Sequence, residues 1–176
     1  MSKFNLRTLF ITALISSTST YAADNLTFKG TLVIPNCVVN NNQTIETNFN
    51  NIEIQTLTLP NIGYHWQPLS IPVHCPYILG MPKIRLMGVQ ATKPNSIKTD
   101  KYEPGKLVIY FKQGTASGQG PDISLGTYNN LTSTYVTGSG NDRKVLITAG
   151  IGREGEMGLL TPGPFSATAN MEFRYE

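Results

Sequence analysis

The last residues of the chain alternate strictly between apolar and polar side chains. From position 165 to 175 every even position is polar and every odd position is apolar, namely Phe165, Ala167, Ala169, Met171, Phe173 and Tyr175. A period of two predicts a β-strand with one buried face. Because chain ends usually fray, so regular a strand at this place predicts that the terminal residues are held in a defined contact.

The rest of the chain also reads as short strands separated by turns. The candidates are rich in Val, Ile, Thr, Tyr and Phe, and clusters of Gly, Pro, Asn or Ser bound them: 31–39, 49–58, 69–75, 83–89, 106–112, 122–126, 135–137, 144–150 and 165–175. No stretch shows helical periodicity over a dozen residues, and there is no internal repeat or composition break. These features predict a single all-β domain, a β-sandwich of Greek-key type.

The first residues have the pattern of a secretory signal peptide. Lys3 and Arg7 precede a short apolar run, and small residues follow up to an expected cleavage after Ala22. The run is far shorter than the roughly 20 residues that span a bilayer. Removal of residues 1–22 would leave 12 basic against 11 acidic residues, a net charge of +1. The basic residues are scattered, so we expect an exported protein that does not bind nucleic acid.

Two cysteines, Cys37 and Cys75, remain in the mature chain. In an exported protein such a pair most simply forms a disulfide. Closing a loop of this length would stabilise the fold by roughly 4 kcal/mol in the entropic model. The alternative is a metal or thiol site that uses His65 or His74. Neither histidine has a known ligand spacing, so no metal and no cofactor are expected.

Residues 24–34, close to the expected cleavage site, form a second alternating segment. One face carries Leu26, Phe28, Gly30, Leu32 and Ile34. One interpretation is an ordinary first strand of the sandwich. The other is a segment that inserts elsewhere, because a glycine within a strand often marks the close approach of another backbone. The residues by themselves leave both interpretations open.

Taken together, these motifs resemble subunits of chaperone–usher pili over essentially the whole mature sequence. The family has a glycine fourteen residues from its C-terminus and a penultimate tyrosine, here Gly163 and Tyr175. It also has an N-terminal extension with a central glycine before the first cysteine, here LTFKGTLVIPNC, and a second cysteine at a strand end, here IPVHCPY. ADNLTFKG, CPY and GPFSATA resemble most the minor subunits of the P-pilus tip fibrillum.

The resemblance implies an immunoglobulin-like sandwich that lacks its last strand and is completed by a donated one. A periplasmic chaperone donates a strand first, and the usher then lets the extension of the next subunit replace it. The implied organisation is a signal peptide (1–22), a donor extension (23–35) and a pilin domain (36–176). The donated face would be Leu26, Phe28, Gly30 and Leu32. The edge that binds the chaperone or the donor strand would run through Gly163, Phe165, Ala167, Ala169, Met171, Phe173 and Tyr175 to Glu176, whose carboxylate would anchor in a basic cleft of the chaperone.

Other functions receive less support. The sequence has no GxSxG, no HExxH and no phosphate-binding loop, so an enzyme is not expected. Trp66, next to Tyr64 and His65, could stack on a sugar, yet such aromatic residues more often pack against the sandwich. We therefore expect a structural minor pilin of a cell-surface fimbria, in the tip fibrillum or as an adaptor, that contacts neighbouring pilins. A major shaft pilin or a carbohydrate-binding adhesin are the alternatives.

Overall fold

The computed structural model describes residues 26–103, 105–115 and 118–176, so the expected signal peptide lies outside the described residues. These ranges contain no α-helix. They therefore include no helix that is long and apolar enough to cross a membrane. They form the strands β1 (Val38–Val39), β2 (Ile62–His74), β3 (Pro82–Met87), β4 (Ser96–Lys98), β5 (Leu107–Gln113), β6 (Asn129–Asn130), β7 (Val136–Ser139), β8 (Asp142–Arg153) and β9 (Asn170–Tyr175). Single turns of 3-10 helix, η1 to η4, lie at Asn40–Asn42, Ile54–Thr56, Ser133–Tyr135 and Met157–Leu159.

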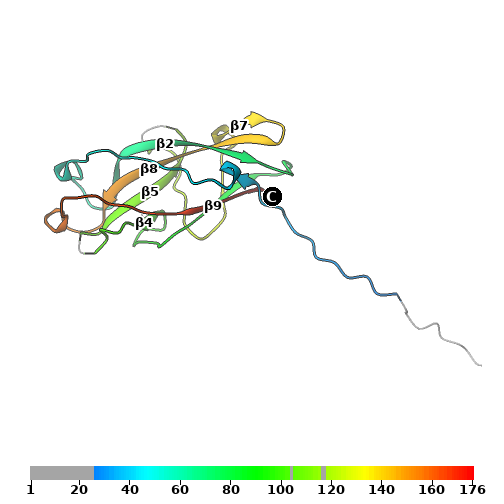
Figure 1. Ribbon diagram of the computed structural model, residues 1–176, viewed down its shortest axis with the longest axis horizontal. Helices are drawn as coiled ribbons and strands as arrows, with labels where there is room; N and C mark the ends of the chain where they lie inside the picture. The colour runs from blue at the N-terminus through cyan, green and yellow to red at the C-terminus, as the bar shows by residue number, and fades with distance from the viewer. Residues whose placement is uncertain (1–25, 104, 116–117) are drawn as a thin grey trace, which may run out of the picture. The chain divides into compact units, whose positions relative to one another are not determined.

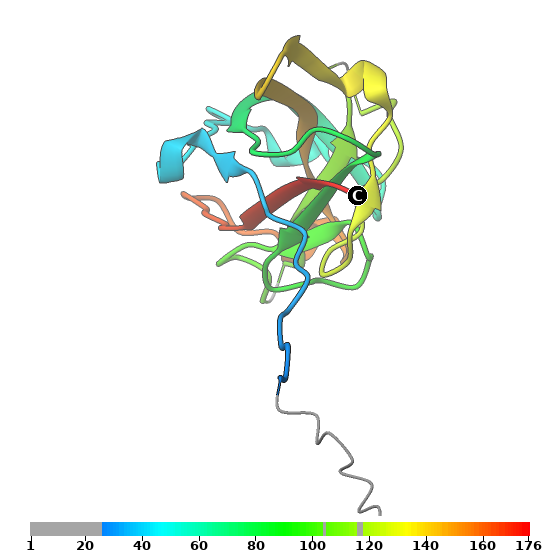
Figure 2. The same cartoon turned by 90° about the vertical axis from the view of Figure 1, so that its right-hand side faces the viewer.

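The strands form two sheets. One has the order β1-β2-β8-β5-β4, with β7 also paired to β8, and the other has the order β6-β3-β9. All ladders between these strands are antiparallel. In both views β7, drawn in yellow, lies away from β9, drawn in red (Figures 1 and 2). The predicted all-β sandwich is thereby confirmed.

The central strands are buried because other segments cover both of their faces. In β5, Leu107, Ile109 and Phe111 face the main core, whereas Val108 and Tyr110 belong to a second apolar cluster with Tyr102. Such strands read as continuous apolar runs instead of alternating ones. Burial also raises the pKa of the Tyr110 hydroxyl, because the phenolate would be desolvated.

The outer edge of β2 carries two prolines. Beyond β1, which pairs only with Val73 and His74, the structure places no strand beside β2 within the described residues. Pro68 and Pro72 both lie in this part of β2. Proline lacks an N–H group and is tolerated on an edge strand, where that group would point away from the sheet. This edge is therefore poorly suited to bind a further strand.

Several predicted strands are confirmed and others are wrong. The ranges predicted at 69–75, 83–89, 106–112, 135–137 and 144–150 match β2, β3, β5, β7 and β8. The range 31–39 shortens to β1, 49–58 contains only η2, and 122–126 contains isolated bridges at Asp122 and Leu125. Strands β4 and β6 were not expected. The three failures share one cause, since a strand is defined by its partner and these segments have little or none.

Candidate functional site

An apolar groove of about 1880 Å³ opens along the body of the protein. Its walls are two segments without strand partners, residues 42–55 and 160–169. Its floor consists of core side chains from both sheets, namely Ile71, Leu86, Ile97, Leu107, Ile109, Phe111, Ile147, Ala149 and Ile151. The groove therefore gives access to the sandwich core itself.

The C-terminal segment forms one wall, and its side chains alternate as the sequence predicts. Phe165, Ala167 and Met171 are half-buried and pack against the core, and Phe173 and Tyr175 are buried. Ala169 is exposed. The predicted strand 165–175 is nonetheless too long, because only Asn170–Tyr175 is paired with a neighbour, β3. Among the described residues, no strand lies beside residues 165–169.

The backbone of this wall directs its hydrogen-bonding groups to two sides in turn. Ser166 and Glu176 bond to the body: Asp100 N donates to Ser166 O at 3.0 Å, and Glu176 exchanges bonds with Met81 at 2.9 and 3.0 Å. Since consecutive residues in a strand point these groups to opposite sides, the odd positions point away from β3. On that side Phe173 O accepts from Cys37 N at 2.8 Å.

We call the odd positions from 165 to 171 the open edge: Phe165, Ala167, Ala169 and Met171. Outside the β3–β9 ladder, no backbone hydrogen bond from these four residues is found in the described part of the chain, and within that ladder Met171 is an odd position that points away from β3. A row of unpaired N–H and C=O groups beside an apolar floor is a template for one more strand. Sequence periodicity identified these residues, but only the structure shows which side of the segment is unpaired.

The start of this wall is held by Asp100 and Lys101. Ser166 N and Oγ donate to the Asp100 carboxylate at 3.0 and 2.9 Å. Lys101 Nζ donates to the carbonyl oxygens of Thr161 and Pro162 at 3.1 and 2.9 Å. The bond from the Ser166 backbone is the main reason why the pKa of Asp100 lies below its ordinary value. Next to them, Gly163 has a φ of 121°, a conformation that favours glycine.

The opposite wall overlaps the range 49–58, which the sequence predicted as a strand and which the structure shows without one. Phe49 and Ile52 pack against the core, and the Phe49 ring lies 6.1 Å from the Phe165 ring, so the two walls touch at that point. Arg153 fixes the end of this wall, since its Nε and Nη2 donate to Leu57 O and Thr58 O at 2.8 and 2.7 Å. The apolar residues of this wall follow no single period, and the strand predicted at 49–58 does not form.

The predicted donor face belongs to a separate unit of the chain, which divides between Leu32 and Val33. Residues 23–25 lie outside the described residues. From residue 26 to 32 there is no assigned strand, and Leu26, Phe28 and Leu32 are 75%, 91% and 103% exposed. A Cβ atom at Gly30 would meet no atom within 4 Å. Among the described residues, the apolar side chains of this stripe are therefore not buried against any other part of the chain.

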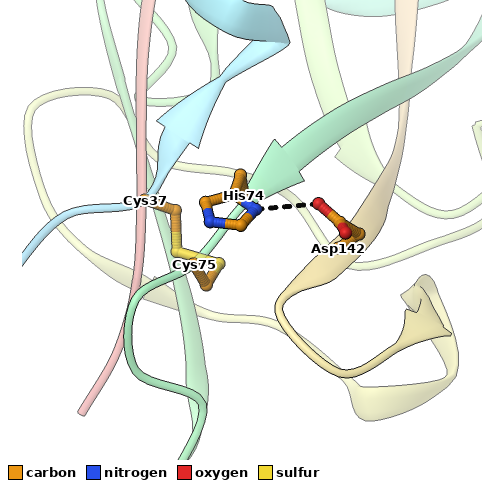
Figure 3. The surroundings of a disulfide bond; sticks show 4 residues. All are labelled: Cys37, His74, Cys75 and Asp142. Carbon is orange, nitrogen blue, oxygen red and sulfur yellow. Dashed lines mark hydrogen bonds and ion pairs between the residues drawn. A yellow bond between two sulfur atoms is a disulfide. The ribbon is translucent and has the colours of Figure 1, made fainter.

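The predicted disulfide is present. Cys37 and Cys75 are joined with a Cα–Cα distance of 4.2 Å, and both are buried. Figure 3 shows the bond beside His74, whose Nδ1 lies 2.8 Å from Asp142 Oδ1. No group of His, Cys, Asp or Glu among the described residues could hold a metal ion. The bond ties the start of β1 to the end of β2.

Glu176 and Trp66 already have contacts in the body. The Glu176 carboxylate side chain contacts Arg174 and lies 3.3 Å from Lys83 Nζ, and the hydrogen bond from Arg174 is the main cause that lowers its pKa. Trp66 is half-buried, and its Nε1 donates to Gly63 O at 2.9 Å. The ring lies against Gly63, Gly118 and Gly150, so packing accounts for it without a sugar.

Comparisons with known proteins agree with this geometry. No family profile matches the chain. The fimbrial protein PrsE of Escherichia coli is 37% identical over 166 residues, which cover 93% of this chain and 91% of PrsE. The fimbrial adapter PapF of Escherichia coli is 26% identical over 171 residues, covering 95% and 96%. The crystal structure of the P pilus rod subunit PapA, 18% identical, superposes with a TM-score of 0.56 over 86% of this chain and 99% of PapA, and shares the fold.

Proposed function

Because the chain belongs to the family of chaperone–usher pilus subunits, we propose that its groove accepts a β-strand from another protein and that its own residues 23–35 are donated to a neighbouring pilin. The protein is a structural subunit of a cell-surface fimbria with a tip or adaptor role, and its fold is the immunoglobulin-like sandwich of pilins. Its relatives are structural pilins, which assemble with other pilins.

One observation carries the proposal: the open edge lies beside a groove whose floor is formed by side chains of the sandwich core. A strand added there would satisfy the unpaired backbone groups of Phe165, Ala167, Ala169 and Met171 through main-chain hydrogen bonds. Its side chains would cover the floor and remove apolar surface from water. The same strand would thus supply both hydrogen bonds and hydrophobic burial.

The length of the predicted donor face supports the same proposal. The open edge spans residues 165–171, and the apolar stripe from Leu26 to Leu32 also spans seven residues. At about 3.3 Å per residue, both extend over roughly 20 Å. A donor of this kind, from a neighbouring subunit, would therefore match the edge from end to end.

Order of assembly follows from the cost of leaving the groove empty. An open groove over the core and an unpaired edge favour aggregation, so a periplasmic chaperone would occupy the groove first and bind the carboxylate of Glu176. At the outer-membrane usher, the extension of the next subunit would replace the chaperone strand. The protein would therefore cross the periplasm bound to its chaperone before it joins the fimbria.

A pair of proline substitutions tests the open edge. Ala169→Pro removes an N–H that points to the open side, whereas Thr168→Pro, one residue earlier, removes one that points to the body. Each variant is co-expressed with a P-pilus-type periplasmic chaperone, and the co-purified complex is measured. We expect Ala169→Pro to lose several-fold more complex, because it removes a main-chain hydrogen bond worth about 1 kcal/mol and places a ring at the edge. Equal capture of the two variants would contradict the assignment.

A further inference from the structure

The loop between β2 and β3 presents apolar side chains to solvent. Tyr77, Leu79 and Met81 are 46%, 67% and 53% exposed. The backbone of the loop is nevertheless fixed: Met81 and Glu176 exchange two hydrogen bonds, and Gly80, with a φ of 105°, lies so close to Glu176 that a Cβ atom would be 2.8 Å from its carbonyl carbon. A fixed loop that exposes three large apolar side chains is typical of a contact surface.

This loop lies at the end of the body where the residues just before Cys37 lead into β1. Val38 pairs with His74 in antiparallel register, so the residues before Cys37 continue in the direction that β2 takes after Cys75. The disulfide holds these two cysteines together. Figure 1 shows the arrowhead of β2 and the C-terminus at this end of the body. We call Tyr77, Leu79 and Met81 the end patch.

A short connection limits the distance to the recipient of the extension. Leu32, the last residue of the predicted donor face, is five residues before Cys37. Even fully extended, five residues span at most about 18 Å, and Pro35 restricts their conformations further. A pilin whose groove holds Leu32 must therefore have its surface within that distance of the disulfide, next to the loop.

We propose that the end patch is a second contact with the pilin that receives the extension, made against the body of that subunit and separate from its groove. The inference rests on the proposed donation of residues 23–35. Contact would remove the three apolar side chains from water, and it would fix the angle between consecutive subunits, which a single donated strand leaves adjustable. The occupant that we propose is the recipient pilin, because the short connection holds its surface within about 18 Å of the disulfide, next to the loop.

Photo-cross-linking in assembled fimbriae tests the inference. The photoreactive amino acid p-benzoylphenylalanine replaces Phe28, Leu79 or, as a control, Ser70, which is exposed in the middle of β2. Fimbriae from cells that produce the chain with its chaperone, usher and partner pilins are irradiated, and the linked peptides are identified by mass spectrometry. We expect positions 28 and 79 to link to the same pilin, and position 70 to link to it far less.

The outcomes separate the inference from the proposed function. Linkage from position 28 without linkage from position 79 would overturn the end patch and leave strand donation standing. Absence of linkage from position 28 would overturn strand donation and the end patch with it. Linkage from position 79 to the chaperone alone would assign the loop to a different partner and contradict the inference.

A substitution gives a second measurement. Leu79→Ser leaves the folded body intact because the side chain is exposed, so the yield of chaperone-bound subunit should not change. Dissociation of assembled subunits in denaturant should become about tenfold faster, as expected when one leucine loses its burial in an interface. Ser70→Ala should change neither quantity. An unchanged dissociation rate for Leu79→Ser would contradict the contact.

Discussion

Two edges of this sandwich differ in how readily an additional strand could form hydrogen bonds with them. Along β2, Pro68 and Pro72 interrupt the edge where no strand follows. Along the C-terminal segment there is no proline after Pro164, apolar residues occupy every odd position, and the backbone of residues 165–171 is unpaired on one side. Natural proteins block the edges that must stay free. The edge without such protection is the one that we propose pairs with a donated strand.

The comparison also separates two halves of the C-terminal segment itself. Asn170–Tyr175 is paired with β3 and ends in buried side chains, whereas residues 165–169 are held mainly by Asp100 at Ser166. Residues 165–169 contribute to the groove, whereas the paired residues Asn170–Tyr175 contribute to the stability of the fold. Substitutions in the two halves should therefore act on different properties.

The largest effect is expected from the paired half. Phe173 is fully buried, so Phe173→Ala should destabilise the domain by about 3 to 5 kcal/mol through loss of burial and an unfilled cavity. Phe165→Ala removes a half-buried ring and its contact with Phe49, and should cost only about 1 kcal/mol. Thermal unfolding of the chaperone-bound variants measures both. Equal losses would remove the distinction between the halves.

Removal of the disulfide tests how much this bond contributes to the stability of the folded body. Replacing Cys37 and Cys75 together by serine should cost roughly 2 to 5 kcal/mol, because the unfolded chain gains freedom and the start of β1 loses its tie to β2. The yield and the unfolding midpoint of the chaperone-bound subunit report the loss. Unchanged values would show that hydrogen bonds such as Cys37 N to Phe173 O suffice.

A smaller effect is expected at Gly30, on the donor side of the comparison. If the groove of the recipient has a shallow place opposite this residue, Gly30→Leu should overpack the contact by about 1 to 3 kcal/mol and leave the body of this subunit unaffected. Peptides of residues 23–34 with Gly or Leu at position 30 are mixed with a chaperone-bound acceptor pilin, and chaperone release is followed. Equal release would show that the glycine is not shape-critical.

The smallest effect is expected at the start of the open edge. Folding lowers the pKa of Asp100 through its bonds from Ser166. The contribution of the Asp100 carboxylate to the free energy of unfolding is therefore complete above its unfolded pKa of about 4. This contribution is lost as the pH falls through the lower pKa of the folded state. Asp100→Asn should lower the unfolding midpoint slightly at pH 7. It should leave the midpoint unchanged at a pH below both the folded and the unfolded pKa of Asp100. A constant difference across this range would indicate that the carboxylate charge is not involved.

Sequence reasoning predicted the parts of the molecule whose pattern is local. The strand pattern at Phe165–Tyr175 and the disulfide between Cys37 and Cys75 could be predicted without knowing a partner. The structure contains the disulfide, and it contains a paired strand at Asn170–Tyr175. The wall around Phe49 was predicted as a strand at 49–58, and this was wrong, because the segment has no strand partner and its place depends on Arg153, about a hundred residues later. The donor face of Leu26, Phe28, Gly30 and Leu32 stays a prediction, since its partner is another molecule.

The stability of the mature chain without any partner tests the central claim most directly. The chain is produced without a chaperone or donor peptide, and size-exclusion chromatography and urea unfolding are recorded. With a groove that reaches the core and an open edge, we expect aggregated or degraded protein and no cooperative monomer, and co-expression with the chaperone should restore a soluble complex. A stable, cooperatively unfolding monomer obtained alone would show that the sandwich is closed and needs no donated strand.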